Sequence, residues 1–72
     1  MTVHTESAKF SFQILNGHLW VTYGLKEIQV TDIEDMEEGK KMTVKGYPVD
    51  CYSRVQSTKF EFTTSTAITH IE

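Results

Sequence analysis

Apolar and polar residues alternate on both sides of Asn16-Gly17 in the segment 9–24. Asn-Gly is a preferred pair for a type I′ turn, because both central residues of that turn have positive φ. A hairpin closed at this turn places the apolar residues opposite one another on one face, in the pairs Ile14 with Leu19, Phe12 with Val21 and Phe10 with Tyr23. The pattern therefore predicts an antiparallel hairpin with one buried face.

The other face of this hairpin is polar apart from Trp20 and its neighbour Leu15. Its cross-strand pairs are Leu15 with His18, Gln13 with Trp20 and Ser11 with Thr22. Aromatic side chains concentrate at protein interfaces, because they bury a large area with few rotatable bonds. Trp20 is therefore either covered by another part of the chain or part of an exposed patch with Leu15, His18 and Tyr52.

The next segments predict a third strand over 25–30 and a short acidic helix over 31–38. Thr31-Asp-Ile-Glu34 fits a capping box, in which the threonine hydroxyl accepts a hydrogen bond from a backbone amide of the first helical turn. Gly39 followed by lysines is typical of a helix end. A helix of two turns is unstable alone, so we expect it to lie on the sheet.

The C-terminal half alternates again, and we expect further strands there. Residues 41–47 form one, which Gly46 and Pro48 mark as bulged, bent or at an edge. Residues 49–55 and 59–64 are expected to pair in a second hairpin, with Arg54 opposite Glu61. The tail 65–72 is expected to be a last strand, with a terminal helical turn as the alternative.

These elements predict a mainly β fold on the border of α+β. We expect five to six short strands in a small antiparallel sheet or a partly open barrel, with the acidic helix around 31–38. Residues 9–72 are expected to form a single small β-rich domain. Residues 1–8 are expected to be a loose leader, unless they add a strand to an edge of the sheet.

The length and the net charge of the chain limit the kinds of protein that it could be. A domain of 72 residues buries a smaller fraction of its surface on folding than a larger domain does, so its stability is expected to be marginal. Its single cysteine allows no internal disulfide. The net charge of −3 argues against a duplex phosphate backbone as the main partner. Without a signal sequence or an apolar run of about 20 residues, the protein is expected to be soluble and cytoplasmic.

No residue pattern indicates catalysis or a metal. The three histidines and Cys51 show none of the spacings of metal ligands, so we expect surface histidines, a buried free thiol and no metal site. There is no glycine-flanked serine or glycine-rich phosphate loop, and a barrel this small leaves little room for a substrate. We therefore expect no catalytic residues, no cofactor and no enzyme activity.

The remaining features favour a non-catalytic protein-protein interaction module. It would be a homo-oligomer, or an accessory or inhibitor-like protein of the phage or mobile-element type whose acidic face mimics a row of phosphates. The expected protein-binding residues are Trp20, His18, Leu15, Tyr52, Asp32, Glu34, Asp35, Glu37 and Glu38.

The alternative is a small β-barrel that binds single-stranded nucleic acid. Trp20 or Tyr52 would stack on bases, and lysines would contact the phosphates. The negative net charge makes nucleic acid the less favoured partner, and no membrane partner is expected.

Overall fold

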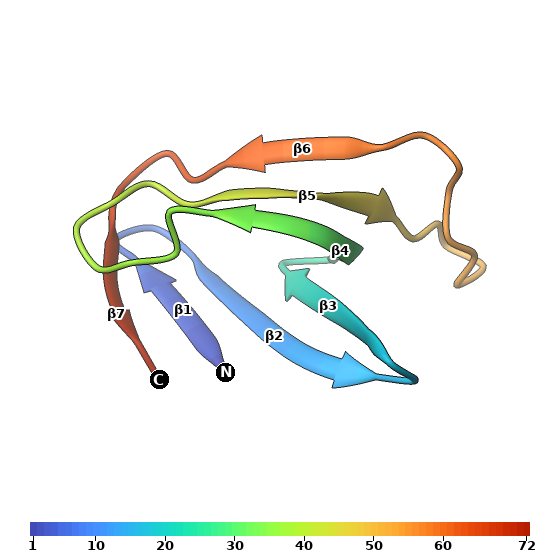
Figure 1. Cartoon of the computed structure of the whole chain (residues 1–72), viewed down its shortest axis with the longest axis horizontal. Coiled ribbons are helices and arrows are strands. Elements are labelled where there is room, and N and C mark those ends of the chain that lie inside the picture. Colours follow the sequence, from blue (N-terminus) through green and yellow to red (C-terminus); the bar gives the residue numbers. More distant parts are fainter.

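Seven β-strands and no helix make up the computed structural model, which describes all of residues 1–72 (Figure 1). The strands are β1 (Thr2–Thr5), β2 (Lys9–Leu15), β3 (His18–Tyr23), β4 (Lys26–Glu34), β5 (Thr43–Pro48), β6 (Phe60–Thr63) and β7 (Ile68–Ile71). They form one antiparallel sheet in the order β6-β5-β4-β3-β2-β1-β7. The predicted mainly β class is confirmed, and the sheet is not closed into a barrel. No helix capable of crossing a membrane is present.

The predicted hairpin is confirmed in β2 and β3, with the expected register. Ile14 lies opposite Leu19, Phe12 opposite Val21, Gln13 opposite Trp20 and Leu15 opposite His18. Asn16 and Gly17 both have positive φ, at 54° and 78°, as the type I′ turn requires. The local turn and the alternation of side chains therefore set this part of the fold.

The sheet bends into two walls that face each other (Figure 1). Strands β1, β2, β3 and β7 form one wall, and β4, β5 and β6 form the other. After β6 the chain crosses from one wall to the other and enters β7 at Ile68. There the Ile68 amide donates to the Lys40 carbonyl at 2.8 Å, and the Gly39 amide donates to the Ile68 carbonyl at 2.9 Å. The space between the walls holds the core, formed by Val3, Phe10, Phe12, Val21, Ile28, Met42, Val44 and Ile68.

The predicted helix over 31–38 is wrong, because β4 continues to Glu34. The Thr31 hydroxyl, expected to cap a helix, donates instead to the Lys45 carbonyl of β5 at 3.2 Å. Ile33 lies opposite Val44, so the neighbouring strand stabilises an extended backbone here. Asp35, with a φ of 58°, begins the loop that follows. A two-turn helix has little stability of its own against such pairing.

The predicted hairpin between 49–55 and 59–64 is also wrong. Residues 49–59 form a loop, and β6 pairs with β5, which places Glu61 opposite Lys45. The Asp50 carboxylate closes the loop by accepting hydrogen bonds from the amides of Tyr52 and Arg54 at 2.9 and 3.0 Å. Local hydrogen bonds of this kind favour a turn over a continuing strand.

Both ends of the chain belong to the sheet. Residues 1–8, expected to be a loose leader, contain β1, which pairs with β2 on one side and β7 on the other. Val3 has no exposed surface, so β1 is part of the core. The tail is a strand, as first expected, and not a helical turn.

Strand β5 lies between β4 and β6, so the expectation that Gly46 and Pro48 mark an edge is wrong. The bulge expected near Gly46 is found on the facing strand, between Val30 and Asp32.

Candidate functional site

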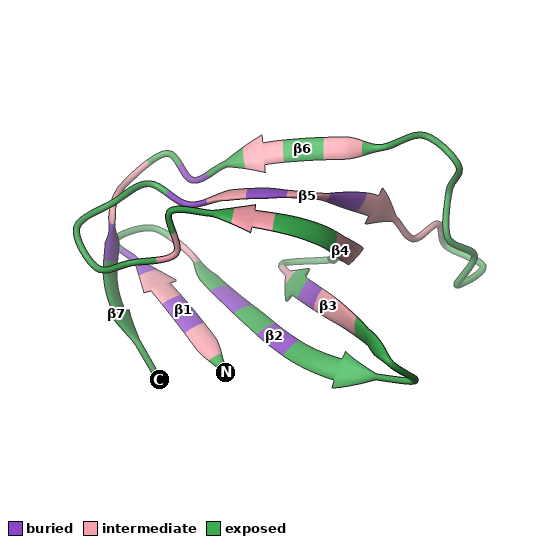
Figure 2. Cartoon of the chain, in the orientation of Figure 1, coloured by how far each residue is buried: buried purple, intermediate pink, exposed green.

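The end of the β2–β3 hairpin carries exposed apolar side chains on the inner face of the sheet. Phe12 is 4% exposed, whereas Ile14, two residues further along the same face, is 78% exposed. Figure 2 shows the same change, with buried positions in the first part of β2 and an exposed end. Burial ends there because the opposite wall does not cover the hairpin end.

A shallow hollow of about 320 Å³ lies at this end, lined by Met1, Phe12, Gln13, Ile14 and Leu19. Met1 is held there by the sheet, because its carbonyl accepts from the Phe12 amide at 2.8 Å and its ammonium donates to the Phe12 carbonyl at 3.1 Å. Four of the five lining residues are hydrophobic, and no side chain among the five is charged. The hollow is therefore suited to an apolar side chain, and the Met1 ammonium is the one charged group among its lining residues.

The outer face of the same hairpin holds three of the predicted binding residues. Leu15 is exposed, and Trp20 is half-buried beside it. The indole N–H of Trp20 donates to the Leu15 carbonyl at 3.1 Å, and the His18 ring meets the indole edge-on at 6.5 Å. The hydrogen bond holds the indole over the end of β2. The structure therefore brings Leu15, His18 and Trp20 together.

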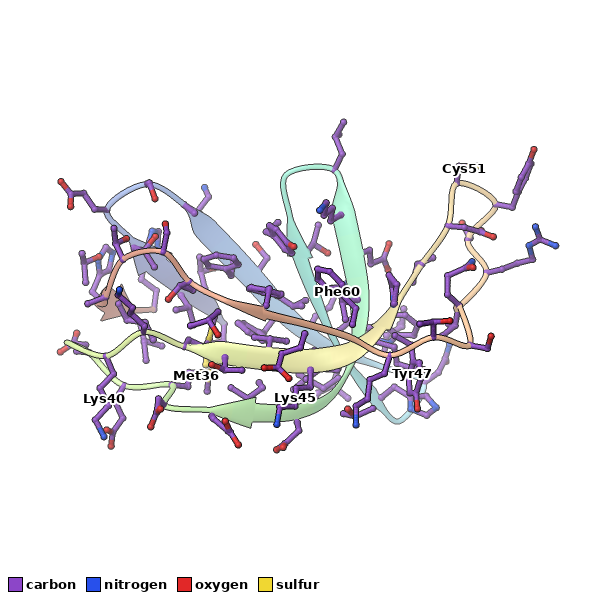
Figure 3. The ribbon with its side chains drawn as sticks, turned by 90° about the horizontal axis from the view of Figure 1, so that it is seen from above. Met36, Lys40, Lys45, Tyr47, Cys51 and Phe60 are labelled. Carbon is purple, nitrogen blue, oxygen red and sulfur yellow. The ribbon has the colours of Figure 1, made fainter.

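Tyr52 does not belong to this group. It lies in the loop 49–59, is exposed, and packs under the Arg54 guanidinium at 5.2 Å from the ring centre. Cys51, expected to be buried, is exposed in the same loop (Figure 3). Its position at the tip of a hydrogen-bonded turn leaves nothing to cover the thiol.

The five predicted acidic binding residues lie along the end of β4 and the following loop. They are Asp32, Glu34, Asp35, Glu37 and Glu38. Two lysines are placed among them (Figure 3): Lys40 Nζ is 2.7 Å from Glu37 and 4.0 Å from Asp35, and Lys45 Nζ is 3.7 Å from Glu34. The hydrogen bond from Lys40 lowers the pKa of Glu37. The two lysines offset part of the charge of the five carboxylates.

A second cluster, which the sequence did not indicate, lies on the outer face of β1 and β7. His4 and His70 are cross-strand partners, and their rings stack with centres 4.0 Å apart and planes 8° apart. Glu72 hydrogen-bonds to His4 Nε2, and this bond lowers the pKa of the Glu72 carboxyl. One potential ligand atom from each of the three residues lies within 4.8 Å of the others. This is the one group in the structure with donors suited to a metal ion.

Sequence reasoning missed both features for different reasons. Alternation along β2 shows that Ile14 faces inward, but it does not show where the opposite wall ends. The two histidines are 66 positions apart, and no spacing rule links them. One signal was available: both histidines lie in segments at the ends of the chain that are rich in β-branched residues and so favour strands. The two histidines would have been found together only if these two strands had been predicted to pair with each other.

No protein-family model matches the chain, and neither the curated proteins nor the solved structures contain a match.

Proposed function

We propose that the chain is a non-catalytic protein-protein interaction module whose contact surface is the end of the β2–β3 hairpin. The observation that carries this proposal is the exposure of Ile14, at 78%, next to a hollow lined mainly by apolar side chains. Contiguous exposed apolar surface on a small protein is typical of interaction sites. The hollow offers no catalytic group, which favours binding over chemistry.

The hairpin end is apolar on both faces. Ile14 and Leu19 lie on the inner face, and Leu15 and Trp20 lie on the outer face. Since Ile14 and Leu15 are exposed on opposite faces, another chain can contact the hairpin end from both sides. An indole that already has its N–H bonded contributes area to such a contact without leaving a donor unpaired.

A second copy of the chain is the partner that we propose. The core holds eight buried hydrophobic residues, and small domains of this size commonly gain stability by association. In a two-fold dimer, the hairpin end of each copy would contact the same surface of the other. A standard interface of about 800 Å² per partner would cover about one sixth of the 4779 Å² surface.

The acidic surface and the nucleic-acid alternative have weaker support. Lys40 and Lys45 lie among the carboxylates, so a phosphate-mimicking inhibitor would present less charge than the sequence implies. Of the four lysines that could contact phosphates, Lys9, Lys26, Lys45 and Lys59, two already contact other side chains: Lys45 Nζ is 3.7 Å from Glu34, and Lys26 Nζ is 5.7 Å from the Phe60 ring centre. These contacts favour the hairpin end as the binding surface.

Sedimentation and native mass measured from about 1 μM to about 1 mM test the proposal, because this range covers weak and moderate dimers. Ile14→Asp places a charge in the hollow and is expected to leave a folded monomer. Thr22→Asp, on an exposed position of β3 away from the hairpin end, is the matched control and is expected to dimerise like the unmodified chain.

An unmodified chain that stays monomeric throughout this range would contradict self-association. Capture of a different protein that depends on Ile14 and not on Thr22 would then support the module with another partner. Capture of nucleic acid in place of protein would favour the alternative.

A further inference from the structure

We propose that His4, His70 and Glu72 form a binding site for a divalent transition-metal ion, and that Zn²⁺ is the ion that these side chains suit best. The site lies on the outer face of β1 and β7. Two imidazole nitrogens and one carboxylate are a common set of Zn²⁺ ligands, and three protein ligands leave a fourth position for water. The site is separate from the hairpin end and independent of the function proposed there.

The backbone holds the two histidines in place before any ion binds. Thr2 and Glu72 exchange both of their backbone hydrogen bonds, at 3.0 and 2.8 Å. In an antiparallel pair such bonded positions alternate, so His4 and His70 form the next bonded pair on the same face. Glu72 lies two residues beyond His70 and therefore faces the same side.

Thr69 determines which nitrogen of His70 is free to bind. Its hydroxyl donates its one hydrogen to the His4 carbonyl at 3.1 Å, so toward His70 Nδ1, at 3.2 Å, it can only accept. The Nδ1 atom of His70 therefore carries the hydrogen, and Nε2 keeps its lone pair. Hydrogen bonds of this kind to the second ring nitrogen commonly orient metal-binding histidines.

His4 and Glu72 already share the position that the ion would occupy. A hydrogen bond joins His4 Nε2 to a carboxylate oxygen of Glu72, so these two atoms already lie next to each other. A metal ion would take the place of the hydrogen between them: a neutral His4 would bind through the lone pair of Nε2 and carry its one ring hydrogen on Nδ1, and a doubly protonated His4 would release its Nε2 hydrogen to solvent. Ligand atoms of a tetrahedral Zn²⁺ lie about 3.3 Å apart, so binding requires the three side chains to draw together from within 4.8 Å. The stacked His4 and His70 rings must also rotate out of their parallel arrangement, so that both lone pairs point at the ion.

The ion would fasten the edge strand β7 to β1. Strand β7 has four residues and lies at an edge of the sheet. Ile68 at its start is buried and bonded to the segment 39–40, whereas the rest of the strand is exposed and pairs only with β1. Small domains commonly use a metal in place of a larger core. Binding to the folded chain alone is expected to raise the Tm by more than about 5 °C at 100 times the dissociation constant.

Titration calorimetry and thermal unfolding with ZnCl₂, on protein free of any histidine tag, test the site. The unmodified chain is expected to bind one ion. His70→Gln and Glu72→Gln, both at exposed positions, are expected to weaken binding at least about 10-fold while leaving the fold intact. His18→Gln removes the one histidine outside the cluster and is expected to change nothing.

Addition of CuCl₂ to the isotope-labelled protein gives a second readout that does not depend on stability. Paramagnetic broadening is expected first at the amides of His4, Thr69 and His70, since Cu²⁺ favours the same nitrogen ligands. Absence of any heat or Tm shift at about 1 mM ZnCl₂ would overturn the proposal. Unchanged affinity in His70→Gln, or broadening centred on His18, would overturn it as well.

Discussion

Gly46 of β5 lies directly against the backbone carbonyl of Gln29 in β4. A Cβ atom at Gly46 would be 2.1 Å from that oxygen and 2.9 Å from Cγ2 of the Ile28 side chain. Both contacts are shorter than real Cβ atoms allow, and the nearer one is to backbone that cannot rotate away. The close approach of the two strands beside the β4 bulge therefore requires a residue without a side chain.

Gly46→Ala is accordingly expected to destabilise the fold by about 1 to 3 kcal/mol or more, because the strands must separate to admit the methyl group. Gly17→Ala is the matched control. Nothing lies within 4 Å of its added Cβ, and the cost there comes from its φ of 78°, at about 1 kcal/mol. Urea unfolding of both variants measures the difference, and an equal loss in the two would contradict the steric explanation.

Thr64 is a buried threonine whose hydroxyl is hydrogen-bonded to the backbone. It accepts from the Met42 amide at 3.0 Å, while its own amide donates to the Met42 carbonyl at 2.8 Å. Thr64→Val keeps the shape but leaves a buried amide unpaired, which is expected to cost about 1 to 3 kcal/mol. Thr64→Ser, which restores the acceptor, should recover part of the loss. Thr63→Val removes an exposed hydrogen bond between the Thr63 and Thr43 hydroxyls and should cost less than Thr64→Val, at most about 1 kcal/mol.

Asp50 is expected to make the loop 49–59 sensitive to acid. The hydrogen bond from the Arg54 amide, with a further one from Tyr52, lowers the pKa of this carboxyl. Since the pKa is lower in the folded chain, the stabilisation is present above the unfolded value of about 3.9 and is lost as pH falls through the folded pKa. Amide signals of Tyr52 and Arg54 should shift in that range, whereas Asp50→Asn should remove the titration. An identical shift in the variant would assign it to another group.

Phe12 and Ile14 provide a direct test of where the core ends. Phe12→Ala empties a buried site and is expected to cost about 3 to 5 kcal/mol. Ile14→Ala, on the same face of the same strand, is expected to change stability by less than about 0.5 kcal/mol. Chemical unfolding measured at a concentration where the chain is monomeric separates the two. A large loss at Ile14 under those conditions would place it in the core and weaken its role in binding.

The sequence by itself determined the hairpin of β2 and β3. Asn16 and Gly17 are adjacent, and the cross-strand partners follow outward from them, so turn geometry and alternation specify the register without help from the rest of the chain. The mainly β class follows from the same local patterns. Trp20 and Leu15 could be assigned to one face for this reason.

Where the local sequence was compatible with two structures, contacts with distant segments decided between them. The Thr31 hydroxyl could cap a helix or bond to β5, and the presence of Lys45 and Val44 beside it selected the strand. Residues 60–63 could pair locally or with β5, and the turn held by Asp50 selected β5.

Contacts between distant segments decided the two candidate sites. Ile14 is exposed because no other segment packs over it, which is a property of the assembled sheet and not of β2. His4 and His70 meet because β1 and β7 pair, although nearly the whole chain separates them. Alternation and turn residues encode neighbours within a hairpin, whereas the order of strands in a sheet depends on which faces become buried when all of them pack together.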